Sequence, residues 1–295
     1  MRTLFAVFGN PILHSKSPLI FNTVFQLLDI NAHYTRVRIE NVRELTTTIR
    51  NLNIYGSNIT SPFKEEVIPH LDEVSEEAKA IGAVNLVINS NGKLKGYNTD
   101  YIGVVKAVEE TGLQLKGRNA LILGAGGAAR AAAYALVSEG ATLFISNRTK
   151  QKAEALAARF GGVAIPYKEL KDVHREFAVT ISALLPEVQF CWDCRCDLFL
   201  DANYRSSKMA RLARSKGLRV ITGERWLIHQ AMANFRLFYD HEPVMQHFEK
   251  GFAKELDPGK IKIGIVGVDD MNSAVAYDLI VTSEEGYRDE LRLLK

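Results

Sequence analysis

The chain has 295 residues, of which 47% are hydrophobic and 24% charged, and 37 Lys and Arg against 34 Asp and Glu give a formal net charge of +3. This composition is that of an ordinary globular protein and excludes a fibrous or disordered one. The small charge and the even spread of Lys and Arg argue against nucleic acid as a partner. At about 150 residues per domain, two domains are expected.

The start of the chain does not read as a signal peptide, and no apolar run approaches the roughly 18 residues needed to span a membrane. We therefore expect a cytoplasmic protein with no membrane partner. Three cysteines, Cys191, Cys194 and Cys196, are crowded together, but structural zinc usually needs four ligands. We interpret them as reduced thiols and expect no metal.

The first hundred residues alternate short apolar runs with amphipathic stretches, which predicts an α/β substrate domain with a largely parallel sheet at 1–101. The last two of its strands should form a hairpin around Asn91-Gly92. Ser17 is the predicted N-cap of the first helix, because Pro18 follows it. Strands are expected at 4–8, 34–39, 57–60, 83–88 and 94–97, and helices at 18–28, 42–50 and 73–81.

A second α/β unit follows a helix expected near 99–111. Its strands and helix repeat in the manner of a doubly wound Rossmann-type domain, which we assign to 102–223. Helices at 224–250 should pack back on the first domain. The tail, 251–295, has alternating Ile residues that predict a strand at 260–265. Strands of the second unit are expected at 119–123, 142–146, 178–181, 198–201 and 219–221, and helices at 127–138 and 224–239.

A glycine-rich loop, Gly124-Ala125-Gly126-Gly127-Ala128-Ala129, joins the first strand of this unit to its Ala-rich helix. Gly124 permits a tight turn, Gly126 lets the backbone approach a pyrophosphate, and Ala129 is small enough for close helix–strand packing. The start of the helix offers free N–H groups to the phosphates. The loop therefore predicts a dinucleotide site.

The residues after the next strand favour NADP over NAD. NAD-binding domains usually place an acidic residue there, which accepts a hydrogen bond from the ribose 2′-OH. This chain has Asn147-Arg148-Thr149-Lys150 instead. An Arg guanidinium can hold a 2′-phosphate through two parallel hydrogen bonds, so NADP is the expected cofactor.

Polar residues gather at the predicted strand ends of the first domain. Ser15 and Ser17 place two hydroxyls beside the open N–H groups of a helix start, which can seat a carboxylate. A second helix is expected to open within Asn58-Ile59-Thr60-Ser61-Pro62-Phe63-Lys64. Ala83-Val84-Asn85 and Gly96-Tyr97-Asn98-Thr99-Asp100 supply further polar groups. Each residue alone is more simply structural, but carboxyl ends of strands are where α/β sheets bind ligands.

Taken in order, these segments resemble the shikimate dehydrogenase family: S-x-S-P, N-x-T-x-P-x-K, G-A-V-N, G-x-N-T-D, and G-A-G-G-A followed by N-R-T. Asp201-Ala202-Asn203-Tyr204 and Leu227-Ile228-His229-Gln230-Ala231 extend the resemblance over residues 3–245. The family reduces 3-dehydroshikimate reversibly to shikimate with NADPH, in chorismate and aromatic amino-acid biosynthesis. The resemblance implies a small-molecule substrate and a monomer or homodimer.

The resemblance also implies roles for individual residues. Lys64 and Asp100 would form the catalytic pair, and Ser15 and Ser17 would hold the substrate carboxylate. The substrate ring would be bound by Thr60, Asn85, Asp100, Gln230 and Tyr204. The cofactor would be bound by Gly124, Ala125, Gly126, Gly127, Ala128, Asn147, Arg148, Thr149, Lys150 and Gly223.

Two alternatives stay open, because the chain departs from the family near the nicotinamide, with Trp226 in place of a customary Met. The chain could act on quinate or another cyclic polyol acid, or it could be a dehydrogenase-like ligand-binding protein with weak turnover. Lys64 together with Asp100 argues against the second alternative, because binding alone does not require that pair.

Overall fold

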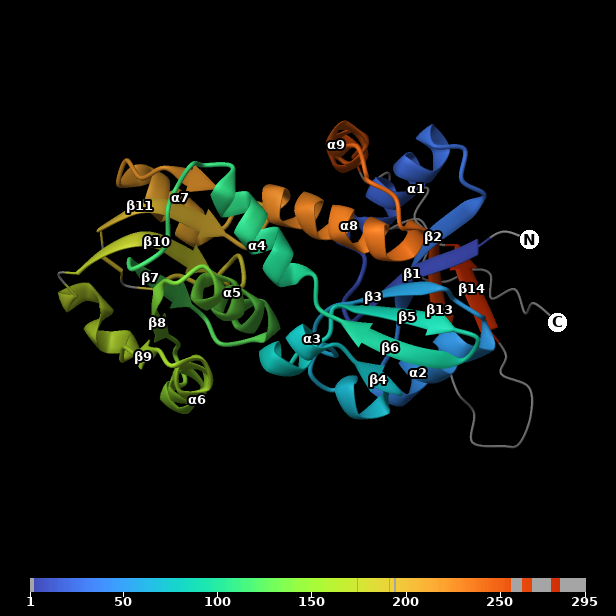
Figure 1. Ribbon diagram of the computed structural model, residues 1–295, viewed down its shortest axis with the longest axis horizontal. Coiled ribbons are helices and arrows are strands. Elements are labelled where there is room, and N and C mark those ends of the chain that lie inside the picture. Colours follow the sequence, from blue (N-terminus) through green and yellow to red (C-terminus); the bar gives the residue numbers. More distant parts are fainter. Residues whose placement is uncertain are drawn as a thin grey trace. The chain divides into compact units, whose positions relative to one another are not determined.

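The computed structural model describes residues 3–173, 175–190, 192–193, 195–255, 262–266 and 277–281. It divides into two compact units, Met1–Asn98 with Asn234–Lys295, and Thr99–Ala233 (Figure 1). Both are α/β units, so the predicted fold class is confirmed. The long helix α8 (Gly223–Tyr239) contributes residues to each unit. Within the described ranges, no helix has the length and apolar character to cross a membrane.

The first unit is built on a mixed sheet with the order β14-β13-β2-β1-β3-β5-β6-β4 among the described residues. From β13 to β3 neighbouring strands run parallel, and β5 and β6 form the predicted antiparallel hairpin. Its strands are β1 (Thr3–Gly9), β2 (Ala32–Arg38), β3 (Gly56–Ile59), β4 (Glu73–Val74), β5 (Leu86–Ser90), β6 (Lys93–Tyr97), β13 (Lys262–Val266) and β14 (Tyr277–Val281). Its helices are α1 (Ser17–Leu27), α2 (Val42–Asn51), η1 (Ile68–His70), α3 (Glu76–Ile81) and α9 (Met245–Ala253).

Two cores cover the faces of this sheet, because successive side chains of a strand point to opposite faces. Phe5 of β1 belongs to an aromatic core with Phe21 and Phe25 of α1 and Phe238 of α8. Ala6 and Phe8 of the same strand belong to an aliphatic core that includes residues of α2. The run Phe5–Gly9, buried throughout, is therefore a central strand that packs on both sides.

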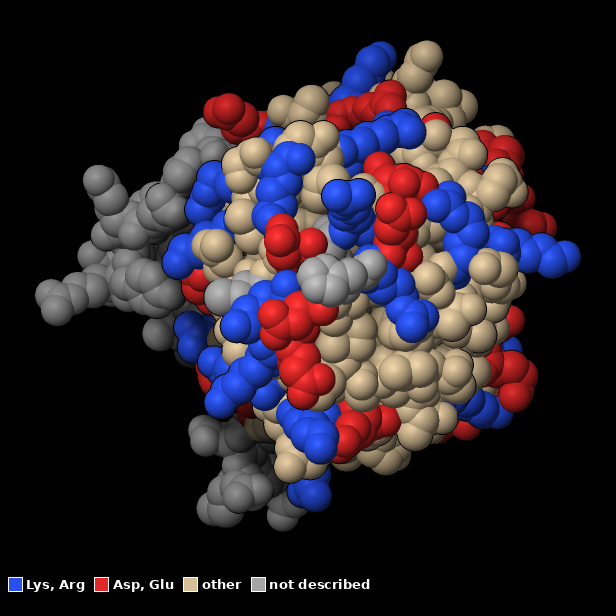
Figure 2. All heavy atoms as spheres, turned by 90° about the vertical axis from the view of Figure 1, so that its left-hand side faces the viewer, with Lys and Arg blue, Asp and Glu red and all other residues tan. Residues whose placement is uncertain are grey.

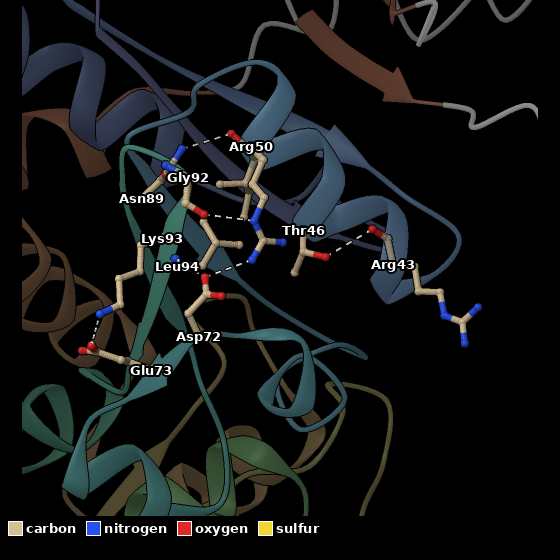
Figure 3. A network of polar contacts seen from close by, with 10 residues as sticks. Arg43, Thr46, Arg50, Asp72, Glu73, Asn89, Gly92, Lys93 and Leu94 are labelled. Atoms are coloured by element: carbon tan, nitrogen blue, oxygen red, sulfur yellow. Dashed lines mark hydrogen bonds and ion pairs between the residues drawn. The ribbon is translucent and has the colours of Figure 1, made fainter. Parts of the chain in front are cut away.

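Arg50, in the last turn of α2, ties that helix to the hairpin (Figure 3). Its Nε donates to the carbonyl of Gly92 at 3.0 Å, and Nη2 lies 3.0 Å from Oδ2 of Asp72. The same carboxylate accepts the N–H of Leu94 at 2.6 Å, and these contacts hold the pKa of Asp72 below its ordinary value. The contacts fix the chain just before Glu73, which starts β4 beside β6.

The predicted helix at 73–81 is therefore wrong at its start. Glu73 and Val74 pair with β6, and the helix begins only at Glu76, with the Ser75 hydroxyl accepting the N–H of Ala78 at 3.2 Å. Residues 61–67, where a second helix was expected to open, form turns that lead into η1. At 73–74 the pairing with β6, distant in the sequence, overrides the helical periodicity.

The second unit is built on a parallel sheet with the order β12-β11-β10-β7-β8-β9 among the described residues. Numbered along the chain this is 3-2-1-4-5-6 read from β9, the doubly wound order of dinucleotide-binding domains. Its strands are β7 (Asn119–Leu123), β8 (Thr142–Ser146), β9 (Val163–Ala164), β10 (Glu176–Ser182), β11 (Arg195–Asp201) and β12 (Val220–Ile221). Its helices include α4 (Asp100–Glu109), α5 (Gly127–Ser138), α6 (Lys150–Phe160), η2 (Tyr167–Asp172) and α7 (Lys208–Ser215).

The surface of the second unit carries charges of both signs. On the face that Figure 2 shows, Lys and Arg side chains alternate with Asp and Glu. Arg118 pairs with Asp197 at 2.6 Å, and Lys216 contacts Asp193. The described residues of this face form no stripe of a single sign.

Candidate active site

Ser15 and Ser17 lie at the start of α1, and both are buried, with 9% and 8% of their surface exposed. Lys16 already has helical angles, φ −86° and ψ −7°, and α1 has no side-chain cap. The prediction that Ser17 is the N-cap is therefore wrong, because the chain becomes helical one residue earlier. Instead, Ser15 Oγ accepts the N–H of Ser17 at 3.4 Å, which leaves the Ser17 hydroxyl free of the capping role.

Arg36 of β2 holds the backbone of Ser15 and was not singled out from the sequence. Its side chain is buried, and Nε donates to the Ser15 carbonyl at 3.0 Å, while Nη2 donates to the same oxygen. Buried Arg residues are almost always paired. An Arg inside a predicted buried strand was therefore the sequence signal that could have found it.

Asn58, Thr60 and Asn85 meet where β3 ends and β5 is about to begin. Asn58 Nδ2 donates to the Asn85 carbonyl at 3.0 Å, and the same carbonyl accepts the N–H of Ile59 at 2.9 Å. Asn85 is 1% exposed and precedes β5, whereas the sequence placed it on the strand itself. Thr60 follows β3 and donates its N–H to Phe8 at 2.9 Å. These bonds fix the Asn58 side chain and the backbone at Thr60 and Asn85.

Lys64 lies in the turns after Thr60 and is half-buried. Its carbonyl accepts the N–H of Val84 at 2.8 Å, which fixes the backbone of the lysine to the segment that leads to Asn85. Asp100, the other half of the predicted catalytic pair, is the first residue of α4 and is 4% exposed. A carboxylate at a helix N-terminus is stabilised by the free N–H groups there.

Tyr204, Gly223 and Gln230 belong to the second unit, the first in a loop and the others on α8. Buried Asp201 accepts the backbone N–H of Asn203 at 3.1 Å, and the pKa of its carboxyl is raised by burial. Asn203 in turn accepts the N–H of Gly223 at 3.2 Å. A Cβ on Gly223 would lie 2.2 Å from the Ala202 carbonyl oxygen, so only glycine fits there.

The glycine-rich loop has the geometry that the sequence predicts. Gly124 directly follows β7, has φ +120° and donates its N–H to the Ser146 carbonyl at 2.8 Å. Ala129 is fully buried against the sheet, and α5 begins at Gly127. A Cβ on Gly126 would meet no protein atom within 4 Å. The space over Gly126 is thus open to a ligand, and the first N–H groups of α5 are available to an anion.

Strand β8 is the neighbour of β7 in the sheet, so the segment after β8 follows the strand next to the glycine-rich loop. This segment is Asn147, Arg148, Thr149 and Lys150. Asn147 Nδ2 donates to the Thr149 carbonyl at 3.0 Å, which shapes the turn. Arg148 is exposed. Lys150 lies 3.4 Å from Glu154 in the next turn of α6, so Arg148 is the better placed of the two cations to bind a phosphate.

The cysteine cluster is only partly described. Cys191 and Cys194 lie outside the described residues, while Cys196 is buried and its thiol has a pKa raised to about 11 by burial. Such a thiol is not a ready nucleophile. Among described residues, no group of three His, Cys, Asp or Glu could hold a metal ion.

Comparison with known families gives two matches that together span most of the first 190 residues. Residues 7–87 match the shikimate dehydrogenase substrate binding domain, and residues 106–188 match the shikimate / quinate 5-dehydrogenase family. The chain is 38% identical over 244 residues to the NADP(+) shikimate dehydrogenase of Aquifex aeolicus, covering 80% of this chain and 90% of the relative.

Two solved structures show the same likeness. The shikimate 5-dehydrogenase of Thermus thermophilus in complex with NADP(H) and shikimate has a TM-score of 0.75 at 33% identity, covering 85% of this chain and 98% of that one. The quinate dehydrogenase of Corynebacterium glutamicum in complex with NAD has a TM-score of 0.77 at 28% identity, with coverage of 85% and 98%.

Proposed function

The chain belongs to the shikimate dehydrogenase family, and we propose that it reduces 3-dehydroshikimate reversibly to shikimate with NADPH. The observation that carries the proposal is that one chain matches both parts of the family, with the serine pair in the first match and the glycine-rich loop in the second. In this proposal the first unit binds the substrate and the second binds the cofactor, with the protein a monomer or a homodimer.

The buried serines would hold the carboxylate of the substrate. Their hydroxyls lie where α1 begins, and hydrogen bonds to a carboxylate are strong because the acceptor is charged. The ring hydroxyls require partners that both donate and accept, which amides and hydroxyls do. The residues proposed to bind the ring are Thr60, Asn85, Asp100, Tyr204 and Gln230.

Lys64 and Asp100 would carry the proton transfer. Ketone reduction turns a carbonyl oxygen into a hydroxyl, so a donor must deliver a proton to that oxygen. The ammonium of Lys64 would donate this proton and stabilise the negative charge developing on the oxygen. The Asp100 carboxylate would accept a hydrogen bond from the reacting hydroxyl and hold it in place. In the oxidative direction the same groups would remove the proton.

NADP fits the second unit at the glycine-rich loop. The loop Gly124–Ala128 would hold the pyrophosphate. The pyrophosphate would lie over Gly126 and accept hydrogen bonds from the first N–H groups of α5. Asn147, Arg148, Thr149 and Lys150 would surround the 2′-phosphate, and Gly223 would lie against the nicotinamide. The bound cofactor supplies the hydride, while the residues of the chain place the substrate carbon to receive it.

The test is an absorbance assay of nicotinamide reduction that compares shikimate with quinate and NADP with NAD. We expect turnover with shikimate and NADP, with kcat/KM at least tenfold above the other three pairs. Because Arg148 stands where NAD-binding domains carry an acidic residue, a quinate enzyme that uses NAD is disfavoured. Preference for quinate would overturn the substrate assignment, and binding without turnover would overturn the enzyme assignment.

A further inference from the structure

Arg36 is a buried cation that grips the backbone of a residue proposed to bind substrate. It is 5% exposed, and two of its N–H groups converge on the carbonyl oxygen of Ser15, with Nε at 3.0 Å. Burying a guanidinium is unfavourable unless it is well paired. An aliphatic residue would fill a strand position next to α1 without that cost. The two converging bonds therefore point to a role beyond packing.

The grip of Arg36 determines where the Ser15 hydroxyl lies. With its carbonyl held by Arg36 and its N–H bonded to Ile12 at 3.1 Å, the peptide plane on either side of Ser15 is fixed. Its Oγ is then close enough to accept the N–H of Ser17. The positive charge of Arg36 also lies at the Ser15 carbonyl, in a buried region where salt screens it little. Both effects favour an anion at the two serine hydroxyls.

The C-terminal extension, the tail at 251–295, contacts both the strand that carries Arg36 and the residue between the two serines. β13 pairs in parallel with β2, with Ile263 opposite Arg36 and Ile265 opposite Arg38. The start of the extension is anchored by Lys16, which lies between the two serines. Lys16 Nζ donates to the carbonyls of Phe252 at 2.7 Å and Lys254 at 3.3 Å.

Helix α1, strand β2 and the start of the extension line a common cavity of about 260 Å³. Its lining includes Pro18 from α1, Arg36 from β2 and Lys254 from the extension. Without β13, β2 would be the edge of the sheet on this side, with unpaired backbone groups. The extension thus supports the strand that carries Arg36, and its start is bonded to the residue between the serines.

We propose that Arg36 is a positioning residue of the substrate-carboxylate site, and that the C-terminal extension braces it through β13. The proposal rests on the proposed function, because it takes Ser15 and Ser17 as the carboxylate site. Arg36 acts through Ser15 and through its charge, and the reacting carbon is not involved. The effect of losing Arg36 should therefore appear in the binding of the acid and spare the chemical step.

The test compares shikimate with its methyl ester, which keeps the ring hydroxyls but lacks the negative charge. In Arg36→Gln, KM for shikimate should rise roughly tenfold, because the carboxylate site loses a nearby positive charge and the fixed position of Ser15, while kcat and KM for NADP stay within threefold. The constant for the ester, measured as KM or as a competitive inhibition constant, should change less than threefold. Arg38→Gln is the matched control, since Arg38 is on the same strand with a half-exposed side chain paired to Glu40 at 3.0 Å.

Circular dichroism and a thermal melt establish that each variant folds. If Arg36→Gln does not fold, Arg36→Lys carries the test, because it keeps the charge but loses the two-pronged contact. A several-fold rise in KM for the acid alone is expected, and an unchanged KM would overturn the proposal. A rise that is equal for acid and ester would show a purely structural role and overturn it as well.

The brace is tested by removing the residues after Leu256, alone and together with Arg36→Gln. Both changes act on one site, so their effects on KM for shikimate should be less than additive. Fully additive effects would overturn the brace. If wild-type protein does not turn over shikimate at all, the proposed function fails, whereas normal wild-type turnover with equal acid and ester effects overturns only the inference.

Discussion

The hydroxyl of Tyr34 donates a hydrogen bond to Oδ1 of Asn58 at 2.6 Å, with both residues buried. Asn58 passes the connection on, because its Nδ2 holds the Asn85 carbonyl and its Oδ1 also accepts from Asn234 at 3.2 Å. Burial raises the pKa of Tyr34 far above its ordinary value, so its hydroxyl stays a donor. The asparagine that opens the N-x-T-x-P-x-K motif is thus a structural link between β2, β3 and α8.

Tyr34→Phe should lower the free energy of unfolding by about 1 kcal/mol, the usual loss for one buried hydrogen bond. The loss stays modest because Asn58 Oδ1 keeps its bond from Asn234. Urea denaturation measures it, and Tyr55→Phe is the control, since the Tyr55 hydroxyl makes a longer bond of 3.3 Å to Phe238. Equal losses in the two variants would show that the network has no special strength.

Three central elements of the second unit were predictable because their signal is local. β7, β8 and α5 have the predicted bounds, since an apolar run between turn residues leaves one choice of strand. β4 was missed because two residues become a strand only by pairing with β6. β13 was predicted as a strand, but its partner was not, because pairing between residues 263 and 36 leaves no trace in periodicity.

The candidate site was predictable where a residue type serves one purpose. Gly124 needs its positive φ and Gly223 its missing Cβ, and both were singled out from the sequence. Arg36 was missed because its proposed role depends on a contact with Ser15, which is distant in the sequence. Ser17 was predicted to be the N-cap of α1, but the N-cap is Lys16, because a sequence pattern places a helix start only to within a residue or two.

Lys64→Ala should lower kcat by about 10² or more, the range for a general acid–base group, with a smaller change in KM for shikimate. A thermal melt checks that the variant folds, and the backbone bond from Val84 to the Lys64 carbonyl does not depend on the side chain. Steady-state kinetics measure the effect. Lys79→Ala is the control, as Lys79 is an exposed lysine paired with Glu76 at 2.7 Å. Turnover near that of wild type in Lys64→Ala would contradict the catalytic assignment.

Arg148→Ala should weaken NADP binding about tenfold to a hundredfold, since a charge-assisted contact contributes roughly 1.5–3 kcal/mol. NAD has no 2′-phosphate, so NAD binding should hardly change. Fluorescence titration of NADPH and NADH measures both constants. The control is Lys152→Ala, in the first turn of α6 and exposed. Equal losses for the two cofactors would show that Arg148 supports the fold of the turn.

Glu110→Gln should destabilise the second unit near neutral pH. Arg225 Nε donates to Oε2 of Glu110 at 2.7 Å, and His229 Nε2 lies 2.9 Å from Oε1. The Arg225 contact, chiefly, lowers the pKa of Glu110 in the folded state. A lowered carboxyl pKa gives stability that is present above the unfolded pKa, about 4.3, and is lost as pH falls through the folded pKa.

The melting temperature of Glu110→Gln should therefore lie below that of wild type at pH 7, and the gap should close as pH falls below about 4. Thermal melts across pH 3–8 measure it. Glu109→Gln is the matched control, because that neighbouring carboxylate is half-exposed and pairs with Lys106. Such surface pairs contribute little, so a gap as large as that of Glu110→Gln would mean that general charge loss is responsible.

Truncation after Leu256 should keep kcat within a few-fold but lower the melting temperature or change the oligomeric state. The truncated chain loses β13 and β14 and leaves β2 as the edge of the first sheet. The unpaired N–H and C=O groups of an exposed edge strand hydrogen-bond either to solvent or to a second copy of the chain. A thermal melt and analytical ultracentrifugation measure the two outcomes, and truncation after Val281, which keeps both strands, is the control. The expected order of melting temperatures is wild type, then the Val281 truncation close to it, then the Leu256 truncation. Unchanged stability together with lost turnover after the Leu256 truncation would place the extension in the catalytic site and contradict its role as a brace.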